Sequence, residues 1–239
     1  KIEFKKYFNF WRNIFDKDDF DVCNIIRDDG IHILIDLSGH TLHNRLALFV
    51  NKPAPIQATW LGCNISTCIP EIDYIIGDKY AFTGNHKEYF VEKIWHFPEV
   101  MQCLSRQNFN LEKKKIPLMK NNFVTFGSFN TGSKFNENLI YIWSDILKSV
   151  KNSKLFLKSN ILEEQSFLES LLKKFKKNGV DENSLIIRSR TKKRIDHLLM
   201  YNQVDITLDT FPYNGNTTSH ESILMGVPGF SSFFLIAII

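Results

Sequence analysis

The sequence has few cysteines and lacks the patterns in which cysteine or glycine does specialised chemistry. Four cysteines occur among 239 residues, in no CxxC pair and at no spacing typical of zinc sites. A chain of this length needs no disulfide bonds to hold a core, so we expect a reducing compartment and predict a cytoplasmic protein. Neither GxxxxGK(S/T) nor GxGxxG occurs, so the sequence offers neither a P-loop nor a dinucleotide fingerprint.

Strong charge and long apolar runs are also missing. The net charge is only +4 and the lysines are spread along the chain, which favours no nucleic-acid partner. The apolar run at the end of the sequence is too short to span a bilayer, so no membrane partner is expected. Without an initiator Met or a signal-peptide pattern, the sequence is interpreted as a piece of a longer protein. Its hydrophobic share of 44% is enough for two compact cores.

Residues 123–239 show strand and helix patterns in alternation. Apolar side chains at helical spacing predict helices at residues 135–150, 163–177 and 195–199. Short apolar runs predict strands at residues 123–129, 154–158, 185–187 and 204–208. Such alternation implies right-handed crossovers and a parallel sheet, with ligands bound beyond the carboxyl ends of its strands.

Residues 1–110 have a less regular pattern but also mix helices with strands. Helices are predicted at residues 3–15, 19–28 and 42–50. Strands are predicted within residues 31–41 and at residues 56–61, 73–76 and 93–97. The polar, proline-containing segment 111–122 is interpreted as a linker, so we expect two α/β domains, at residues 1–110 and 123–239.

The strand within residues 31–41 is expected to be buried and to alternate its side chains between two faces. His32 and Asp36 lie on one face, and Ser38 and His40 follow the strand directly. Polar groups at such a place favour a strand end that opens on a cleft. For His32 the alternative is a hydrogen-bonded histidine of the core.

Polar side chains gather in three loops that follow predicted strands. Because the carboxyl ends of parallel strands lie at one edge of a sheet, we expect these loops to form one rim. Cations, hydroxyls and a helix N-terminus on that rim would suit a diphosphate. The rim residues are Asn130, Thr131 and Lys134 in the first loop, Arg190, Lys193, Arg194 and His197 in the second, and Asp209, Asn214, Gly215, Asn216, Thr217, Thr218 and Glu221 in the third.

The third loop leads into a predicted helix that ends at Gly226. Thr218 and Glu221 have the spacing of a capping box at its start. Glu221 is also suited to accept hydrogen bonds from ribose hydroxyls. The alternative is an ordinary capped loop, in which Glu221 serves only the cap and Lys134 is a solvated lysine at a helix start.

Six blocks of the sequence carry a resemblance to a known family. In order along the chain they are ILIDLSGHTLHNRLALF, KPAPIQATWLG, IDYIIGD, FGSFNTGSK, HLLMYNQVDITLDTFPYNGNTT and MGVP. Here the chain resembles the catalytic region of glycosyltransferase family 41, the O-GlcNAc transferase and Spindly-like family, in its bacterial form. The resemblance implies a GT-B architecture, with two Rossmann-like domains that have parallel sheets and are both incomplete in this chain. Residues 1–110 would be the latter part of the N-terminal catalytic domain, and residues 123–239 would bind a nucleotide sugar.

The resemblance also implies roles for rim residues. Lys134 would contact the diphosphate and steady the leaving group, while Thr217 and Thr218 would bind phosphate. His197 would lie beside the nucleoside, and Glu221 would hold the ribose. Animal members of the family have a histidine where this chain has Asn216, so one diphosphate contact is expected to differ.

The reaction implied by the resemblance is an inverting transfer that uses neither a metal nor a cofactor. A sugar, expected to be N-acetylglucosamine, would pass from a UDP- or GDP-sugar to Ser or Thr of a protein acceptor, which tetratricopeptide repeats outside this chain would present. Lys134 would stabilise the departing diphosphate. Asp29, His32 and His40 are the candidates for the general base, and the sequence does not choose among them.

Other readings of the same resemblance stay open. O-fucosyl or N-glucosyl transfer also occurs in the family. A non-catalytic domain would bind a nucleotide sugar without transferring it, and a scaffold protein would bind neither UDP nor GDP. Because the sequence covers only part of the family's catalytic region, little transferase activity is expected from the 239 residues alone.

Overall fold

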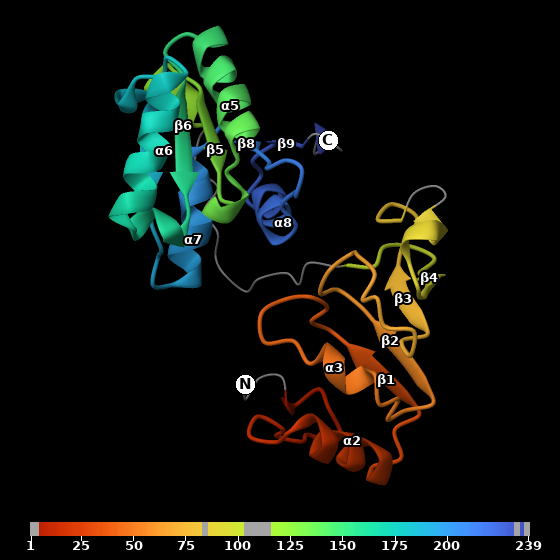
Figure 1. Ribbon diagram of the computed structural model, residues 1–239. Coiled ribbons are helices and arrows are strands. Elements are labelled where there is room, and N and C mark those ends of the chain that lie inside the picture. The colour runs from red at the N-terminus through yellow and green to blue at the C-terminus, as the bar shows by residue number, and fades with distance from the viewer. Residues whose placement is uncertain (1–4, 83–85, 103–115, 232–234, 237–239) are drawn as a thin grey trace. The chain divides into compact units, whose positions relative to one another are not determined.

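The structure of the protein is a computed structural model that describes residues 5–82, 86–102, 116–231 and 235–236 (Figure 1). The chain divides into two compact units, residues 1–105 and 106–239. Each unit has a sheet of mainly parallel strands, and the predicted α/β class is confirmed. Within the predicted linker, residues 111–115 lie outside the described part. The remainder contains α4 (Pro117–Asn121), where the Leu118 N–H donates to Asp205 of the second unit at 2.8 Å.

The first unit contains a four-stranded sheet whose strands pair in chain order. The strands are β1 (Ile33–Asp36), β2 (Ile56–Thr59), β3 (Tyr74–Gly77) and β4 (Lys93–His96), all parallel. The helices are α2 (Asp19–Asp28), α3 (Leu46–Phe49) and the 3-10 helix η1 (His86–Tyr89). Asp18 caps α2 by accepting a hydrogen bond from the Asp21 N–H at 2.8 Å, so α2 begins where the sequence predicts.

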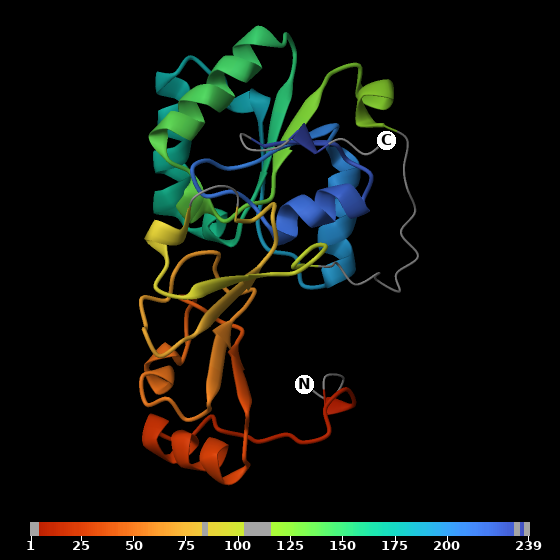
Figure 2. The ribbon, with the colours of Figure 1, turned by 90° about the vertical axis from the view of Figure 1, so that its right-hand side faces the viewer.

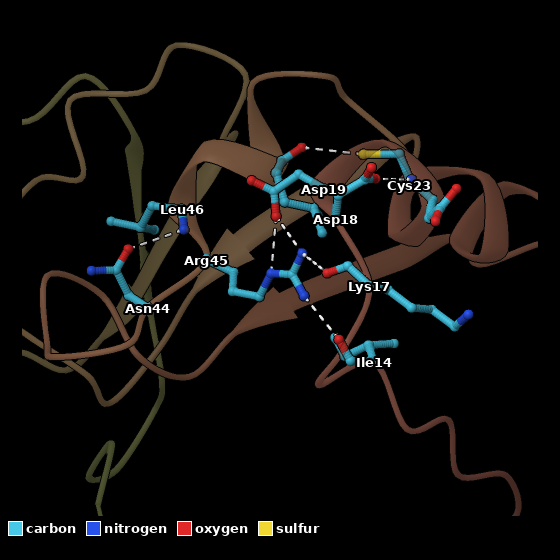
Figure 3. Close-up of polar contacts among 10 residues, drawn as sticks. Ile14, Lys17, Asp18, Asp19, Cys23, Asn44, Arg45 and Leu46 are labelled. Carbon is cyan, nitrogen blue, oxygen red and sulfur yellow. Dashed lines mark hydrogen bonds and ion pairs between the residues drawn. The ribbon is translucent and has the colours of Figure 1, made fainter.

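The predicted helix at residues 3–15 is wrong, because residues 8–14 form no helix. Its aromatic stripe has no apolar surface to cover within the described residues, and such a surface is what stabilises most protein helices. Arg45 holds the segment instead: its guanidinium binds the carbonyl oxygens of Ile14 at 3.1 Å and Lys17 at 3.0 Å and the carboxylate of Asp19 at 2.5 Å (Figure 3). The side chains left exposed are Tyr7, Phe8, Phe10, Trp11 and Phe15.

Two elements of the first unit differ from the prediction in length or burial. The helix expected at residues 42–50 is reduced to α3, because His43 has a left-handed φ of 63°. In β1 the predicted alternation is confirmed, with Ile33 and Ile35 on one face and Asp36 on the other. The expected burial is wrong for the isoleucine face, since Ile33 is 51% exposed and Asp36 only 6%. Within the described residues, the core cluster of α2 and α3 reaches β1 through Leu34 alone.

The second unit contains a six-stranded sheet with the order β10-β9-β8-β5-β6-β7. Its parallel strands are β5 (Thr125–Ser128), β6 (Lys154–Lys158), β7 (Leu185–Arg188), β8 (Ile206–Leu208) and β9 (Gly229–Phe230). Only β10 (Leu235–Ile236) pairs antiparallel, with β9. The four strands predicted for this half are confirmed.

Helices cover both faces of this second sheet (Figure 2). On one face α5 (Glu137–Ser149) and α6 (Gln165–Lys177) enclose a core around Trp143 and Phe175. On the other face α7 (Arg194–Met200) and α8 (Thr217–Leu224) belong with a cluster around Phe129 and Tyr201. Four 3-10 helices lie in the connections, namely η2 (Gly132–Lys134), η3 (Asn160–Glu163), η4 (Glu182–Ser184) and η5 (Tyr201–Gln203).

Among the helices that the structure describes, none is both long and apolar enough to cross a membrane.

Candidate functional site

The loops that follow β5, β7 and β8 meet at the carboxyl edge of the second sheet, as the strand directions predict. The first and third loops are joined by hydrogen bonds: the Asn130 amide donates to Asp209 at 3.1 Å, and Lys134 Nζ donates to the Asn214 carbonyl at 2.8 Å. The helix that follows the second loop is joined to α8 by ion pairs of Glu221. The expected rim is therefore one connected structure.

Lys134 is a half-buried lysine at the centre of this rim. Its ammonium donates to Asn130 Oδ1 at 3.2 Å as well as to the Asn214 carbonyl, and lies 4.3 Å from the centre of the Tyr213 ring. Burial lowers the pKa of Lys134, while the negative charge of Asp209 opposes that shift. The alternative of a solvated helix-start lysine is therefore wrong. Thr131, by contrast, is exposed, and its hydroxyl lies 3.4 Å from that of Ser133.

Asp209 organises the loop that follows β8. One of its carboxylate oxygens accepts hydrogen bonds from the Thr210 N–H at 2.8 Å and the Gly215 N–H at 2.6 Å, besides the bond from Asn130. The loop is packed so tightly at Gly215 that a Cβ there would lie 2.4 Å from the Thr218 hydroxyl and 2.9 Å from the Asp209 carboxylate. Only glycine fits this position without a shift of its neighbours.

The capping box predicted for α8 is wrong. The N-cap position is held by Asn216, and none of the described side chains caps the helix. Thr218 lies inside the helix with its hydroxyl 3.4 Å from Asn130 Oδ1, and Glu221 turns inward to 1% exposure. The first turn of α8, at Thr217 and Thr218, therefore has no side-chain acceptor in the described part of the chain and is suited to an anion.

A buried carboxylate, Glu221, links α8 to α7. Its two oxygens are 2.5 Å from the Arg194 guanidinium and 2.8 Å from His197 Nε2, and the Tyr201 hydroxyl donates to it at 3.1 Å. Burial raises the pKa of Glu221, but the hydrogen bond and charge of His197 and the charge of Arg194 outweigh it and leave that pKa below its ordinary value. Glu221 thus holds Arg194 and His197 in place as an ionised anchor.

Tyr201 is a residue that the sequence analysis missed. It is fully buried, its ring stacks on Phe129 with centroids 3.7 Å apart, and its hydroxyl also donates to the Thr218 carbonyl at 3.1 Å. Burial raises the pKa of Tyr201, and the charge of Glu221 raises it further. Nothing in the periodicity of the sequence marks this tyrosine, because its neighbours come from other parts of the chain.

An open pocket with a volume of about 440 Å³ lies beside this cluster, at the ends of β5, β6 and β7. Its walls include Phe129, Asn130, Thr131 and His197 together with several cations. The cations are Lys158, Arg190, Lys192, Lys193 and Arg194. Lys158 was not predicted as a site residue, although a lysine at the carboxyl end of a buried strand is an available signal.

The structure does not bring together the three candidate bases of the first unit. Asp29 and His32 lie at the amino end of β1, where Asp29 forms an ion pair with Arg12 at 2.5 Å. The hydrogen bond from Arg12 lowers the pKa of Asp29. His40 follows the carboxyl end of β1, is exposed, and has Nε2 3.0 Å from the Ser66 carbonyl.

Asp36, at the end of β1, stabilises the loop that carries His40. Its carboxylate accepts hydrogen bonds from the Ser38 N–H at 3.0 Å, the Gly39 N–H at 2.7 Å and the Thr59 hydroxyl at 2.8 Å. The buried polar face of β1 therefore has a structural explanation. No group of three or more His, Cys, Asp or Glu side chains is placed to hold a metal in the part of the chain that the structure describes.

Comparison with known proteins adds the family. The family model described as glycosyl transferase family 41 matches residues 16–123 and 105–232. The chain is 36% identical over 218 residues to a protein of Eustoma exaltatum subsp. russellianum named probable UDP-N-acetylglucosamine–peptide N-acetylglucosaminyltransferase SPINDLY, a match that covers 91% of this chain and 24% of that protein. The similarly named SPINDLY protein of Arabidopsis thaliana is 34% identical over the same shares.

Two solved structures give the fold. A mutant O-GlcNAc transferase of Thermobaculum terrenum matches with a TM-score of 0.90 and 30% identity, over 95% of this chain and 43% of that one. Anabaena HepE in complex with UDP matches with a TM-score of 0.56 and 13% identity, over 88% and 62% of the two chains, which is a likeness of fold alone. The expected GT-B type of fold is confirmed. The chain spans about a quarter of the length of the curated relatives that it matches.

Proposed function

Since the chain belongs to glycosyl transferase family 41, we propose that the protein of which it forms part transfers a sugar from a nucleotide diphosphate to Ser and Thr hydroxyls of other proteins. N-acetylglucosamine is the proposed sugar, because the names of the relatives give UDP-N-acetylglucosamine as their donor. One observation supports this proposal above the others. The half-buried cation Lys134 and the uncapped first turn of α8 lie on one rim, where a diphosphate would find both a charge and free N–H groups.

The proposed reaction is a direct displacement. The acceptor oxygen attacks the anomeric carbon from the side opposite the diphosphate, the bond from that carbon to the phosphate oxygen breaks, and the configuration inverts. The hydroxyl proton passes to a base, and the electron pair of the broken bond leaves with the diphosphate. Lys134, with the N–H groups of Thr217 and Thr218, stabilises the charge as it develops, without a metal or a cofactor.

The remaining site residues hold this arrangement. Asn130 accepts a hydrogen bond from Lys134, and Asp209 fixes both Asn130 and the loop at Gly215. Glu221 is enclosed by its partners, so its proposed part is to orient Arg194 and His197 toward the nucleoside. Among the candidate bases, His40 is favoured by its place after the carboxyl end of β1.

In this proposal the 239 residues bind the nucleotide sugar but do not transfer its sugar efficiently by themselves. They correspond to about a quarter of the length of their relatives. Acceptor proteins would be presented by other parts of the protein, tetratricopeptide repeats among them. We place the protein in the cytoplasm in this proposal, since Cys23, Cys63 and Cys68 are free thiols. Fractionation of cells that express a tagged protein tests that location.

The test of the proposal uses the full-length protein and Lys134→Met. A thermal-shift screen against UDP- and GDP-sugars identifies the donor by the set that stabilises the protein. Lys134→Met is expected to lower the rate of transfer roughly 100- to 1000-fold, as loss of an oxyanion-type contact does, with a much smaller change in donor affinity. Lys148→Met, on the surface of α5, is the matched control and keeps the wild-type rate.

Three results would contradict the proposal. They are a full rate for Lys134→Met, a rate that is lost when EDTA removes divalent metals, and no stabilisation by any nucleotide sugar.

A further inference from the structure

Lys158 is the last residue of β6 and one of the most enclosed lysines of the chain, with 7% of its surface exposed. Lysines are rarely buried to this extent unless a carboxylate pairs with them. Within the described residues, however, no hydrogen bond or short ion pair of Lys158 is found. Lys158 is one of the residues that line the open pocket, together with His197 and Arg194.

The carboxylate whose charge acts on Lys158 is that of Glu221, but its oxygens have other partners. Arg194 lies 2.5 Å from one oxygen, and His197 and Tyr201 lie 2.8 Å and 3.1 Å from the other. Lys158 is influenced by Glu221 only through its field: burial lowers the pKa of Lys158, and the charge of Glu221 opposes that shift. Since the carboxylate of Glu221 already has a cation, Lys158 is, among the described residues, a surplus cation with unused donors at the wall of the pocket.

The pocket continues from the rim that carries Lys134. Phe129, Asn130 and Thr131 belong to its wall, and Asn130 also accepts the hydrogen bond from Lys134. A ligand whose diphosphate lies at Lys134 and α8 therefore extends its other end into this pocket. For a nucleotide sugar, one end is the sugar and the other is the nucleoside. His197 also lines this pocket, and an aromatic ring is suited to stack on a nucleobase.

We propose that Lys158 determines which nucleobase the site accepts, by donating to a keto oxygen of the base. This inference rests on the proposed function, since it assumes that a nucleoside diphosphate is bound. An ammonium only donates hydrogen bonds, so the proposed partner is O6 of guanine or O4 of uracil, the keto oxygens that adenine and cytosine lack. Cytosine and adenine have an amino group, which also donates, at that same position, so neither offers an acceptor to the ammonium there.

Pairs of nucleotides that differ mainly in this group provide the test. Calorimetric titration of the full chain with UDP and CDP compares a keto with an amino group on a pyrimidine, and GDP and ADP make the same comparison on a purine. The wild-type chain is expected to prefer the keto member of at least one pair by roughly 10- to 100-fold, the value of one hydrogen bond to a charged group. Which pair shows the preference tells uracil from guanine.

The variant Lys158→Met keeps the length of the side chain and removes its donors. It is expected to abolish the keto preference while the amino member of each pair binds as before. Lys158→Arg keeps a cation that only donates hydrogen bonds and is expected to retain the keto preference. This variant controls for a change in preference that is caused by altered packing around residue 158. Lys154→Met, at the opposite end of the same strand, is the matched control and leaves every affinity unchanged.

The outcomes separate the two proposals. If the wild-type chain binds the nucleotides without a keto preference, or if Lys158→Met weakens all four equally, Lys158 acts on the phosphates or on the fold and the inference is overturned. The proposed function then still stands. If the wild-type chain binds none of the four diphosphates, both the inference and the proposed function are overturned.

Discussion

Replacement of Glu221 by glutamine tests whether the buried carboxylate is an ionised anchor. Glutamine keeps the shape of the side chain, and its one oxygen can still accept hydrogen bonds from His197 and Tyr201. Its NH₂ group then faces the guanidinium of Arg194, and both of these groups can only donate hydrogen bonds. The Arg194 side chain is 44% exposed, so water screens much of the lost ion pair, which contributes about 1 kcal/mol at most. The two remaining hydrogen bonds weaken when their acceptor becomes neutral, by about 1 kcal/mol in total.

Burial of a neutral amide costs less free energy than burial of a carboxylate, which offsets part of this loss of stability. The free energy of unfolding of Glu221→Gln is therefore expected to fall by about 1–2 kcal/mol at neutral pH.

The pH dependence of this difference has a definite sign. In the folded chain the pKa of Glu221 lies below its ordinary value of 4.5, because its partners outweigh the effect of burial. A carboxyl group with a lowered pKa stabilises the fold above its unfolded pKa and loses that contribution as the pH falls through its folded pKa. The difference between wild type and variant is thus expected to be present above pH 4.5 and to shrink as the pH falls below that value.

Urea unfolding followed by the fluorescence of Trp143 measures this difference. Trp143 is 2% exposed and lies in the second unit, whereas Trp11, Trp60 and Trp95 lie in the first and are replaced by phenylalanine in the background used. Glu182→Gln, at an exposed position, serves as the control and is expected to change nothing. Equal stability of Glu221→Gln and wild type at neutral pH, or a difference that grows in acid, would refute the reasoning.

Two further predictions concern the loops. Gly215→Ala places a Cβ 2.4 Å from the Thr218 hydroxyl, so nucleoside diphosphate affinity measured by calorimetry is expected to fall roughly tenfold or more. Gly179→Ala, where φ is positive but space is free, is expected to lower stability and leave affinity intact, and equal affinities for the two variants would contradict the argument. Asp36→Asn replaces an acceptor of the Gly39 N–H by an amide and is expected to lower the stability of the first unit by about 1–2 kcal/mol in thermal unfolding; an unchanged midpoint would contradict it.

Much of the second unit follows from local patterns in the sequence. The strand β6 has the predicted bounds, Lys154–Lys158. A short apolar run that lies between two helices of an α/β chain is too short for a further helix and is typical of a buried strand. The predicted strand directions place three loops on one rim, and the contacts of Asn130 and Lys134 agree with that placement. The role of Lys134 was inferred from the resemblance to the family and stays a prediction.

Other features depend on neighbours that the sequence does not name. The aromatic stripe before Asp18 has the spacing of a helix but covers no apolar surface within the described residues, and Ile33 has the pattern of a buried strand but stays half exposed. In both cases the local pattern indicates which side chains could be buried, but they are buried only where another apolar part of the protein packs against them.

The rim itself shows the same division. By itself the sequence determined which loops gather there, because strand direction follows from the order of strands and helices. Only the tertiary structure decided that Glu221 faces Arg194 and His197 instead of capping α8, and that Lys158 lines the same pocket without a hydrogen-bond partner among the described residues. The physical reason is that the charge state and partner of a buried polar group depend on side chains from distant parts of the chain, which only the packed fold brings within hydrogen-bonding distance.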